Sequence, residues 1–226
     1  MKLAVRKLAA RLPGSWRRQL RFWHTQRKIN SGRFRSEEPE YDLLPGLLRE
    51  GEWAIDIGAN LGHYTARLSE LVGPSGRVFA FEPVLETFAI LSRNALLLRQ
   101  GNVTLFNIAA SDRVRVVDIN IPKYQDGLTN FYQARIGGYC EENSIRSFAM
   151  PIDGLSIENK VSLIKIDAEG HERAVLMGMH ALLRRDKPIL ILETADAELE
   201  SEIASMGYDI ERMDSSPNLL CRPSDY

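Results

Sequence analysis

Residues 53–62 read WAIDIGANLG, and this stretch decides the fold class. The apolar run at 53–57 predicts a short buried strand, and the glycines that follow it predict a tight turn. Apolar side chains at helical spacing then predict a helix over residues 62–72. A strand that passes through a glycine-rich turn into a helix is the opening of a βαβ unit. We therefore expect an α/β protein with a parallel sheet.

The same alternation of strands and helices continues along most of the chain. The expected helices cover residues 41–49, 84–98, 171–183 and 197–206. The expected strands cover residues 77–81, 103–108, 114–121, 161–166, 189–192, 208–213 and 219–221. Helical crossovers of this length imply a mainly parallel sheet with helices on both faces. In such a sheet, ligands bind beyond the carboxyl ends of the strands.

The turn after the first strand has an unusual charge for a nucleotide site. A dinucleotide fingerprint places a glycine where this chain has Asp56, because a pyrophosphate must approach the backbone there. The Asp56 carboxylate would repel a pyrophosphate but attract an ammonium group, and the N-terminus of the following helix could hold a carboxylate. A ligand with a zwitterionic amino-acid tail satisfies both ends, and S-adenosylmethionine is such a ligand.

Glu82 directly follows the second strand of the βαβ unit. In nicotinamide enzymes, an acidic residue in this place accepts hydrogen bonds from the ribose hydroxyls. Glu82 therefore predicts a ligand that contains a nucleoside, without selecting which one. Together with the turn and the βαβ context, it makes nucleoside binding the expected property of the domain.

A dense group of titratable residues follows the strand at 161–166. Residues 164–172 read IKIDAEGHE, which places three carboxylates and an imidazole at the carboxyl edge of the sheet, and Glu193 ends the neighbouring strand. Glu172 has two interpretations. It is either an acidic residue in the first turn of a helix, where its charge interacts favourably with the helix dipole, or a functional group. Asp167 stands directly at the strand end and is the better functional candidate.

Five segments together resemble the FkbM family of S-adenosylmethionine-dependent methyltransferases. They read WAIDIGANLGHYT (53–65), GRVFAFEP (76–83), NVTLFNIAASD (102–112), LIKIDAEGHE (163–172) and ILILET (189–194). The resemblance spans about residues 37–213 and leaves the first 36 residues outside it. It implies the class I methyltransferase (Rossmann-like) fold, with a mainly parallel seven-stranded sheet whose last strand is antiparallel.

The resemblance also implies an activity and a cofactor site. The activity is O-methylation, commonly of sugar hydroxyls in glycans and glycolipids or of hydroxyls in natural products. The residues implied for S-adenosylmethionine are Asp56, Gly58, Ala59, Asn60, Gly62 and Glu82, with Ala109, Ser111 and Asp112 on the adenine side. Residues 123–150 are poorly covered, and we expect them to help shape the acceptor pocket.

Methyl transfer from a sulfonium to oxygen is a direct displacement, so the enzyme must align the hydroxyl and accept its proton. Asp167 is the first candidate for this base or orienting group, followed by Glu169 and by His171, whose intrinsic pKa lies near neutrality. Asp167 and Glu193 could instead hold a divalent metal, since hard cations prefer oxygen ligands. The sequence does not complete a ligand set, and we predict no metal site.

Charge is divided unevenly along the 226-residue chain. Residues 1–36 contain 11 basic residues and no acidic one, whereas residues 37–226 contain 18 basic and 30 acidic residues. A basic arm thus precedes an acidic methyltransferase domain. The arm begins with an apolar helical stripe, which ends at Pro13 and Gly14 and consists of Met1, Val5, Leu8 and Leu12. An aromatic cluster follows, which consists of Trp16, Leu20, Phe22 and Trp23. The arm fits a solvated face or packing on the domain, contact with an anionic membrane, or organelle targeting.

Composition limits the class of protein. A hydrophobic fraction of 44% and a charged fraction of 26% are ordinary for a globular domain, and no run of about 18 apolar residues predicts a membrane span. Only two cysteines occur, Cys140 and Cys221, which argues against a disulfide framework and favours a reducing, cytoplasmic compartment. Their spacing is not that of a zinc site. We expect a small-molecule or glycolipid acceptor. Two other functions stay open: an RNA-directed methyltransferase that uses the arm as a phosphate clamp, and a non-catalytic adaptor.

Overall fold

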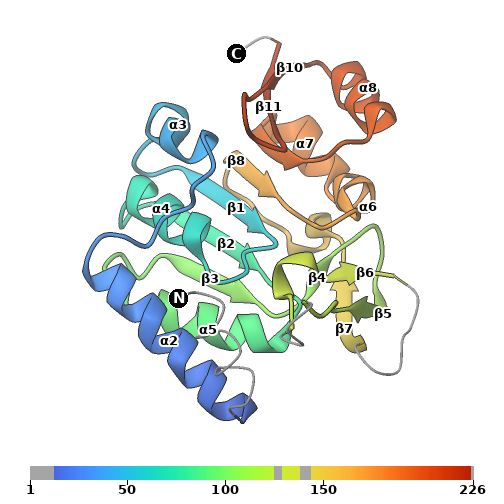
Figure 1. The fold of residues 1–226 in the computed structure, drawn as a ribbon. Coiled ribbons are helices and arrows are strands. Elements are labelled where there is room, and N and C mark those ends of the chain that lie inside the picture. The colour runs from blue at the N-terminus through green and yellow to red at the C-terminus, as the bar shows by residue number, and fades with distance from the viewer. Residues whose placement is uncertain (1–12, 125–128, 138–143, 225–226) are drawn as a thin grey trace.

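A seven-stranded sheet forms the centre of the protein (Figure 1). The computed structural model describes residues 13–124, 129–137 and 144–224. The strands lie in the order β10 (Tyr208–Arg212), β11 (Asn218–Pro223), β9 (Ile189–Glu193), β8 (Val161–Ile166), β1 (Trp53–Ile57), β2 (Arg77–Phe81) and β3 (Val103–Phe106). Strands β9, β8, β1, β2 and β3 pair in parallel, and β11 is antiparallel to both neighbours. This topology confirms the predicted class I methyltransferase fold.

Helices cover both faces of the sheet, as predicted. The helices on one face are α3 (Glu40–Leu47), α4 (His63–Val72) and α5 (Leu85–Ala95), and those on the other are α6 (Glu172–Met177), α7 (His180–Asp186) and α8 (Ala197–Ser205). Side chains alternate along a strand, so Ile55 and Ile57 of β1 join the core under α6 and α7. Ala54 joins the core under α4, and Asp56 shares its face. This alternation decides where Asp56 points.

A second, four-stranded sheet lies beside the carboxyl edge of the main sheet (Figure 1). Its strands are β4 (Ala109–Ala110), β7 (Ser144–Met150), β5 (Arg115–Asn120) and β6 (Arg135–Ile136), in that spatial order. Of these, the sequence predicted only β5, as a strand over residues 114–121. The sheet has a core of its own, which includes Val117, Ile119 and Ala149.

The predicted helix over residues 171–183 is interrupted. It forms as α6 and α7, separated at Gly178. A Cβ at this position would lie 1.9 Å from the main-chain oxygen of Ser111, so the helical segment and the loop after β4 approach each other more closely than a side chain permits. The break therefore results from packing, which the helical spacing of apolar residues does not reveal.

Helix α2 (Gly14–Asn30) is an element that the sequence did not predict. The helical stripe expected over the first 12 residues lies outside the described part of the chain. In Figure 1 α2 runs along the outside of α5, and the hydroxyl of Thr25 donates a hydrogen bond to Asn94 Oδ1 at 3.0 Å. The Arg93 guanidinium lies over the Phe22 ring, 4.8 Å from its centroid. Among the described residues, no helix is long and apolar enough to cross a membrane.

Candidate active site

The turn between β1 and α4 brings two strand ends together. Gly58 has a φ of 74°, and a Cβ there would lie 1.8 Å from the main-chain oxygen of Asp167, just beyond β8. Only glycine permits this approach. Asn60 also adopts a left-handed conformation, with a φ of 50°, which asparagine tolerates better than most residues. The turn is therefore held against the carboxyl end of β8.

Glu82, at the end of β2, holds the same turn from the other side. Its Oε2 accepts a hydrogen bond from the Asn60 N–H at 2.8 Å. Its Oε1 accepts hydrogen bonds from the Val84 N–H at 2.9 Å and from the Thr87 hydroxyl at 2.8 Å. A carboxylate has about four lone-pair positions, so one on Oε2 remains for a ligand hydroxyl. Burial raises the pKa of Glu82 to about 7, although the three hydrogen bonds favour the carboxylate.

A cleft of about 600 Å³, counted to its open mouth, lies between these strand ends and the second sheet. Its wall includes seven of the predicted site residues: Gly58, Asn60, Glu82, Ala109, Asp167, Glu169 and His171. The other predicted cofactor residues do not line it: Asp56, Ala59, Gly62, Ser111 and Asp112. The three candidate catalytic residues thus share one cleft with part of the candidate cofactor site. Their individual roles stay predictions.

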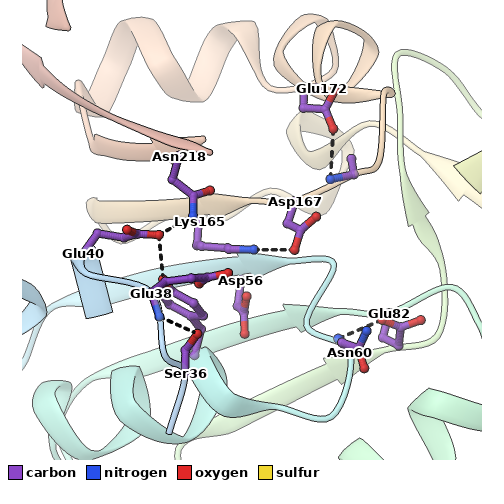
Figure 2. Close-up of polar contacts among 12 residues, drawn as sticks. Ser36, Glu38, Glu40, Asp56, Asn60, Glu82, Lys165, Asp167, Glu172 and Asn218 are labelled. Carbon is purple, nitrogen blue, oxygen red and sulfur yellow. Dashed lines mark hydrogen bonds and ion pairs between the residues drawn. The ribbon is translucent and has the colours of Figure 1, made fainter. Parts of the chain in front are cut away.

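A buried lysine lies beside Asp167 (Figure 2). Lys165 Nζ is 2.8 Å from Asp167 Oδ2, and the lysine side chain is only 3% exposed. Burial alone would lower the pKa of Lys165, but the charges of Asp167 and Asp56 outweigh it and raise this pKa above its ordinary value. The ammonium is therefore charged, and two aspartates share it.

Asp56 lies behind the wall of the cleft. It pairs with Lys165 across β1 and β8, its residue is 1% exposed, and it accepts a hydrogen bond from the Thr65 hydroxyl at 2.5 Å. A lysine of the chain supplies a positive charge beside Asp56, and the expected contact between Asp56 and a ligand ammonium stays a prediction. Asp56 also fixes β1 against β8 and α4.

Two further carboxyl groups line a second groove: Glu169, which also lines the cleft, and Glu193. Burial, and then the charge of Asp167, raises the pKa of each to about 7. Glu172 has a structural contact instead, since its Oε1 accepts hydrogen bonds from the N–H groups of Ala168 and Gly170 at 3.1 and 2.9 Å. It lies in the first turn of α6, as one sequence interpretation held, and fixes the loop that carries Glu169.

His171 is tied to the adenine-side residues predicted from the sequence. Its Nε2 lies 2.9 Å from Ser111 Oγ, and the Ser111 hydroxyl donates to Asp112 Oδ1 at 3.0 Å. A serine hydroxyl has one proton, so His171 Nε2–H donates to Ser111 and the Nδ1 lone pair remains free. Burial, and then the charge of Arg115, lowers the pKa of His171. The imidazole is therefore neutral at pH 7 and able to accept a proton.

The residues of the cleft fit S-adenosylmethionine. Asn60 Oδ1 is buried without a hydrogen-bond partner in the described part of the chain, so a ligand donor would satisfy it. The remaining lone pair of Glu82 suits a ribose hydroxyl. Apolar walls from Val84, Ile119 and Phe131 suit a purine ring. No cluster of three or more potential metal ligands occurs among the described residues, which gives the pair of Asp167 and Glu193 no third partner of these types there.

Comparison with known protein families identifies the chain. The Methyltransferase FkbM domain matches residues 56–210, which is more than half of its length. The chain belongs to the FkbM methyltransferase family. The match confirms the resemblance found in the sequence. S-adenosylmethionine is accordingly the cofactor of this protein.

The chain is also similar to individual proteins. FkbM from Methylobacillus flagellatus KT matches with a TM-score of 0.58 and 22% identity, over 78% of this chain and 45% of that protein. A SAM-dependent methyltransferase from Aquifex aeolicus matches with a TM-score of 0.47 and 17% identity, over 81% and 89%. A protein-L-isoaspartate O-methyltransferase from Methanothrix thermoacetophila is 39% identical over 64 residues. Those residues are 28% of this chain and 30% of the relative, so the chain spans less than half of two of these proteins.

Lys165, which lies beside Asp167 of the candidate active site, was not identified from the sequence. Its signal was present in the sequence, because a lysine between two isoleucines in an apolar strand must be buried and paired. Phe131 and Tyr132 were also missed as residues of the wall. They lie in the segment where the family resemblance was weakest, and no spacing marks them.

Proposed function

We propose that this protein transfers a methyl group from S-adenosylmethionine to a hydroxyl oxygen of a carbohydrate, glycolipid or similar polyol acceptor. One observation carries the proposal, which is the position of Asp167 in the wall of the cleft. Lys165 binds its Oδ2, and Oδ1 has no hydrogen-bond donor among the described residues. A fixed carboxylate with one free oxygen can orient a hydroxyl group and accept its proton.

The chain's own residues divide the work of the reaction. S-adenosylmethionine, when bound, supplies an electrophilic methyl group. Asp167 Oδ1 accepts the hydrogen bond of the acceptor hydroxyl and then its proton, while Lys165 holds the carboxylate in place as a positioning residue. Glu169, with a pKa of about 7, is the next proton acceptor within the same cleft. Alignment by these groups replaces the random encounter of the two reactants.

The acceptor is proposed to enter along the second groove, which crosses the ends of β8 and β9. Glu169, Glu193 and Thr194 line it and offer oxygens that accept hydrogen bonds from hydroxyl groups. The two arginines of the groove are already paired with acidic residues: Arg173 with Asp196 and Glu202, and Arg212 with Glu200. An RNA backbone would meet unneutralised carboxylates here, so the groove supports a polyol better than a nucleic acid.

The test is transfer of a labelled methyl group. The protein is incubated with S-adenosylmethionine labelled in the methyl group and with separate glycan, glycolipid and RNA fractions. The proposal predicts label in a carbohydrate-containing product, as an ether that survives mild alkali. It also predicts that Asp167→Asn abolishes most of this incorporation.

Three results would contradict the proposal. Label in RNA would support the phosphate-clamp alternative, and alkali-labile label would show transfer to a carboxylate. Tight binding of S-adenosylhomocysteine without transfer to any of the three fractions would favour the non-catalytic adaptor.

A further inference from the structure

Helix α2 has an outer face that the fold does not use. Trp16, Leu20, Trp23 and Arg27 recur at helical spacing along it, and we call these four residues the α2 outer face. Trp16 is 61% exposed, Leu20 43% and Trp23 55%, and Arg27 is exposed as well. Two indoles and a leucine in one line are more than a scattered apolar surface, so this face calls for an explanation.

The opposite side of α2 anchors the helix to the domain. Gln19 accepts a hydrogen bond from Arg93 at 3.2 Å, Phe22 lies under the same arginine, and Thr25 bonds Asn94 of α5. The sequence had placed Phe22 in one cluster with the two tryptophans, but the structure turns Phe22 inward and leaves Trp16 and Trp23 outward. The outer face therefore stands on a fixed helix.

The same helix borders the candidate active site. Arg21, His24 and Thr25 line a cavity of about 200 Å³ together with Asn60 and Tyr132, which also line the cofactor cleft. The Arg21 guanidinium lies 4.9 Å from the centroid of the Phe131 ring. A surface bound to the outer face would consequently lie across this helix from the cavity, one helix diameter or ~10 Å away.

The charge around the outer face has one sign. Arg17, Arg18, Arg27 and Lys28 form no ion pair with a carboxylate of the described residues, and no acidic residue occurs before Glu37. An anionic surface would neutralise these cations, whereas the acidic remainder of the chain would be repelled by it. The surface must also accept two indole rings, which favour the boundary between water and hydrocarbon.

We propose that the α2 outer face docks the protein on an anionic lipid bilayer. Trp16, Leu20 and Trp23 would enter the headgroup layer, and the flanking basic residues would lie at the anionic headgroups. A nucleic acid would meet the apolar ridge before it met the basic flanks, so its phosphates suit the face less well. The inference goes beyond methyl transfer, because it requires neither cofactor nor acceptor.

The experiment measures binding of the full-length chain to vesicles. Vesicles of phosphatidylcholine with phosphatidylglycerol are compared with phosphatidylcholine alone, by sedimentation and by tryptophan fluorescence. Truncation is avoided, because removal of α2 would uncover its contacts with α5. Trp16→Ala with Trp23→Ala tests the apolar ridge, and Arg17→Gln with Arg27→Gln tests its charge. The matched control is Met177→Ala with Met206→Ala, which removes side chains that are 64% and 44% exposed elsewhere.

The proposal predicts binding to the anionic vesicles, a blue shift of the fluorescence, and weaker binding at high salt. Each basic residue near an anionic surface contributes about a fivefold gain in partitioning, so the arginine pair should weaken binding by roughly tenfold or more. We expect a loss of similar size for the tryptophan pair and no change for the methionine pair. All three double variants should keep the parent melting temperature.

Four results would overturn the proposal. These are equal binding to neutral vesicles, undiminished binding of the tryptophan pair, absence of binding to either vesicle, and RNA binding that the tryptophan pair weakens as much as lipid binding. Self-association that disappears in the tryptophan variant would assign the face to a second copy of the chain instead. Each result is independent of whether the protein methylates a polyol.

Discussion

Lys165 and Asp167 form an ion pair whose two partners differ in exposure, 3% for the lysine side chain and 26% for the aspartate. Removing an ammonium from water costs several kcal/mol unless paired groups compensate it. Asp56 and Asp167 supply that compensation, and only Asp167 also reaches the cleft. The pair therefore contributes to the stability of the sheet and also fixes the position of Asp167 in the candidate active site.

The first prediction concerns Asp167 itself. Replacement of Asp167 by Asn keeps the size of the side chain and an oxygen for Lys165, but it removes the group that accepts a proton. We expect turnover to fall by roughly 10²–10⁴, the usual contribution of a general base. Affinity for S-adenosylhomocysteine should change far less. Initial rates at saturating acceptor, together with calorimetry, check both halves of the prediction.

Near-normal turnover in Asp167→Asn would move the role of the base to Glu169 or His171. Asp209→Asn is a suitable control, because Asp209 is exposed on β10, where its carboxylate accepts a hydrogen bond from the Ser224 hydroxyl. A parallel loss of activity in this control would indicate a general loss of folded protein.

At the scale of single residues, the sequence predicted the positions that follow strand ends. Glu82 and Asp167 were found because parallel strands deliver their last residues to one edge of the sheet. The contact of Asp56 with a ligand ammonium stays a prediction, but the neighbour of Asp56 was not foreseen, since a single strand does not show which charge the next strand brings. Lys165 is that charge; its sequence context indicates burial and pairing, but its place opposite Asp56 follows only from the register of β1 and β8.

Close contacts between elements determine the shape of the cleft. The turn after β1 touches the end of β8 through Gly58, and the break between α6 and α7 touches the loop after β4 through Gly178. Neither contact leaves room for a Cβ, so both positions require glycine for space and not only for flexibility. The contact at Gly58 also sets the separation of the cofactor turn from Asp167.

The second prediction tests the Gly58 contact. Gly58→Ala should reduce the free energy of unfolding by roughly 2–5 kcal/mol, from left-handed strain together with the clash at 1.8 Å. Cofactor affinity should fall with it, because the turn must move away from β8. Gly207→Ala is the matched control, since Gly207 has a φ of 87° and no atom within 4 Å of the added Cβ.

The control should lose only about 1–2 kcal/mol, the cost of the left-handed conformation alone. Denaturant unfolding and titration with S-adenosylhomocysteine measure the two effects. Equal losses in both variants, with cofactor binding unchanged in Gly58→Ala, would show that the contact with Asp167 does not matter.

At the scale of elements, the sequence predicted those with strong local periodicity. The main sheet and most of its helices follow from apolar spacing, because each element buries one face against its neighbours. Helix α2 was missed because its single fully buried residue is Thr25, so no apolar stripe marks the inner face. The second sheet was missed because its strands pair across distant segments, such as β5 with β7.

Acidic groups gather at the carboxyl edge of the whole molecule. Glu82, Glu169 and Glu193 each have a pKa raised to about 7, in every case first by burial, whereas an unfolded glutamate has a pKa of about 4.3. At these three groups the folded chain therefore binds more protons than the unfolded chain between these values. Their contribution to stability is consequently lost as the pH rises through about 7, whereas His63 and His171, whose pKa values burial lowers, act in the opposite sense below about pH 6.5.

The third prediction follows from this pH dependence of the stability. The contribution of these three glutamates to the free energy of unfolding should decrease between pH 5 and pH 8, and Glu193→Gln should recover its share of the loss. Because Glu193 is only half-buried and is screened by solvent, we expect a gain of about 1 kcal/mol at pH 8, or roughly 2–4 °C in melting temperature. The gain should shrink towards pH 5, where the folded carboxyl group is protonated.

Thermal unfolding of the parent, Glu193→Gln and Glu158→Gln across this pH range provides the measurement. Glu158 is exposed, so its variant should follow the parent at every pH. A gain for Glu193→Gln that is constant with pH would contradict the proposed electrostatic cause.

The central claim is that the cleft at the ends of β1, β2 and β8 holds S-adenosylmethionine through Glu82. Calorimetric titration with S-adenosylhomocysteine tests it most directly, in the parent, in Glu82→Ala and in Thr87→Val. The last variant is the control, since it removes one support of the Glu82 carboxylate and leaves the carboxylate itself.

We expect a dissociation constant in the micromolar range for the parent, as for a preformed apolar cleft with a few placed polar groups. Glu82→Ala should weaken binding by about 1–3 kcal/mol, or roughly fivefold to more than a hundredfold, and Thr87→Val by much less. Equal affinity of Glu82→Ala and the parent would contradict the assignment of Glu82. Tight binding of NADH with no response to S-adenosylhomocysteine would contradict the whole account.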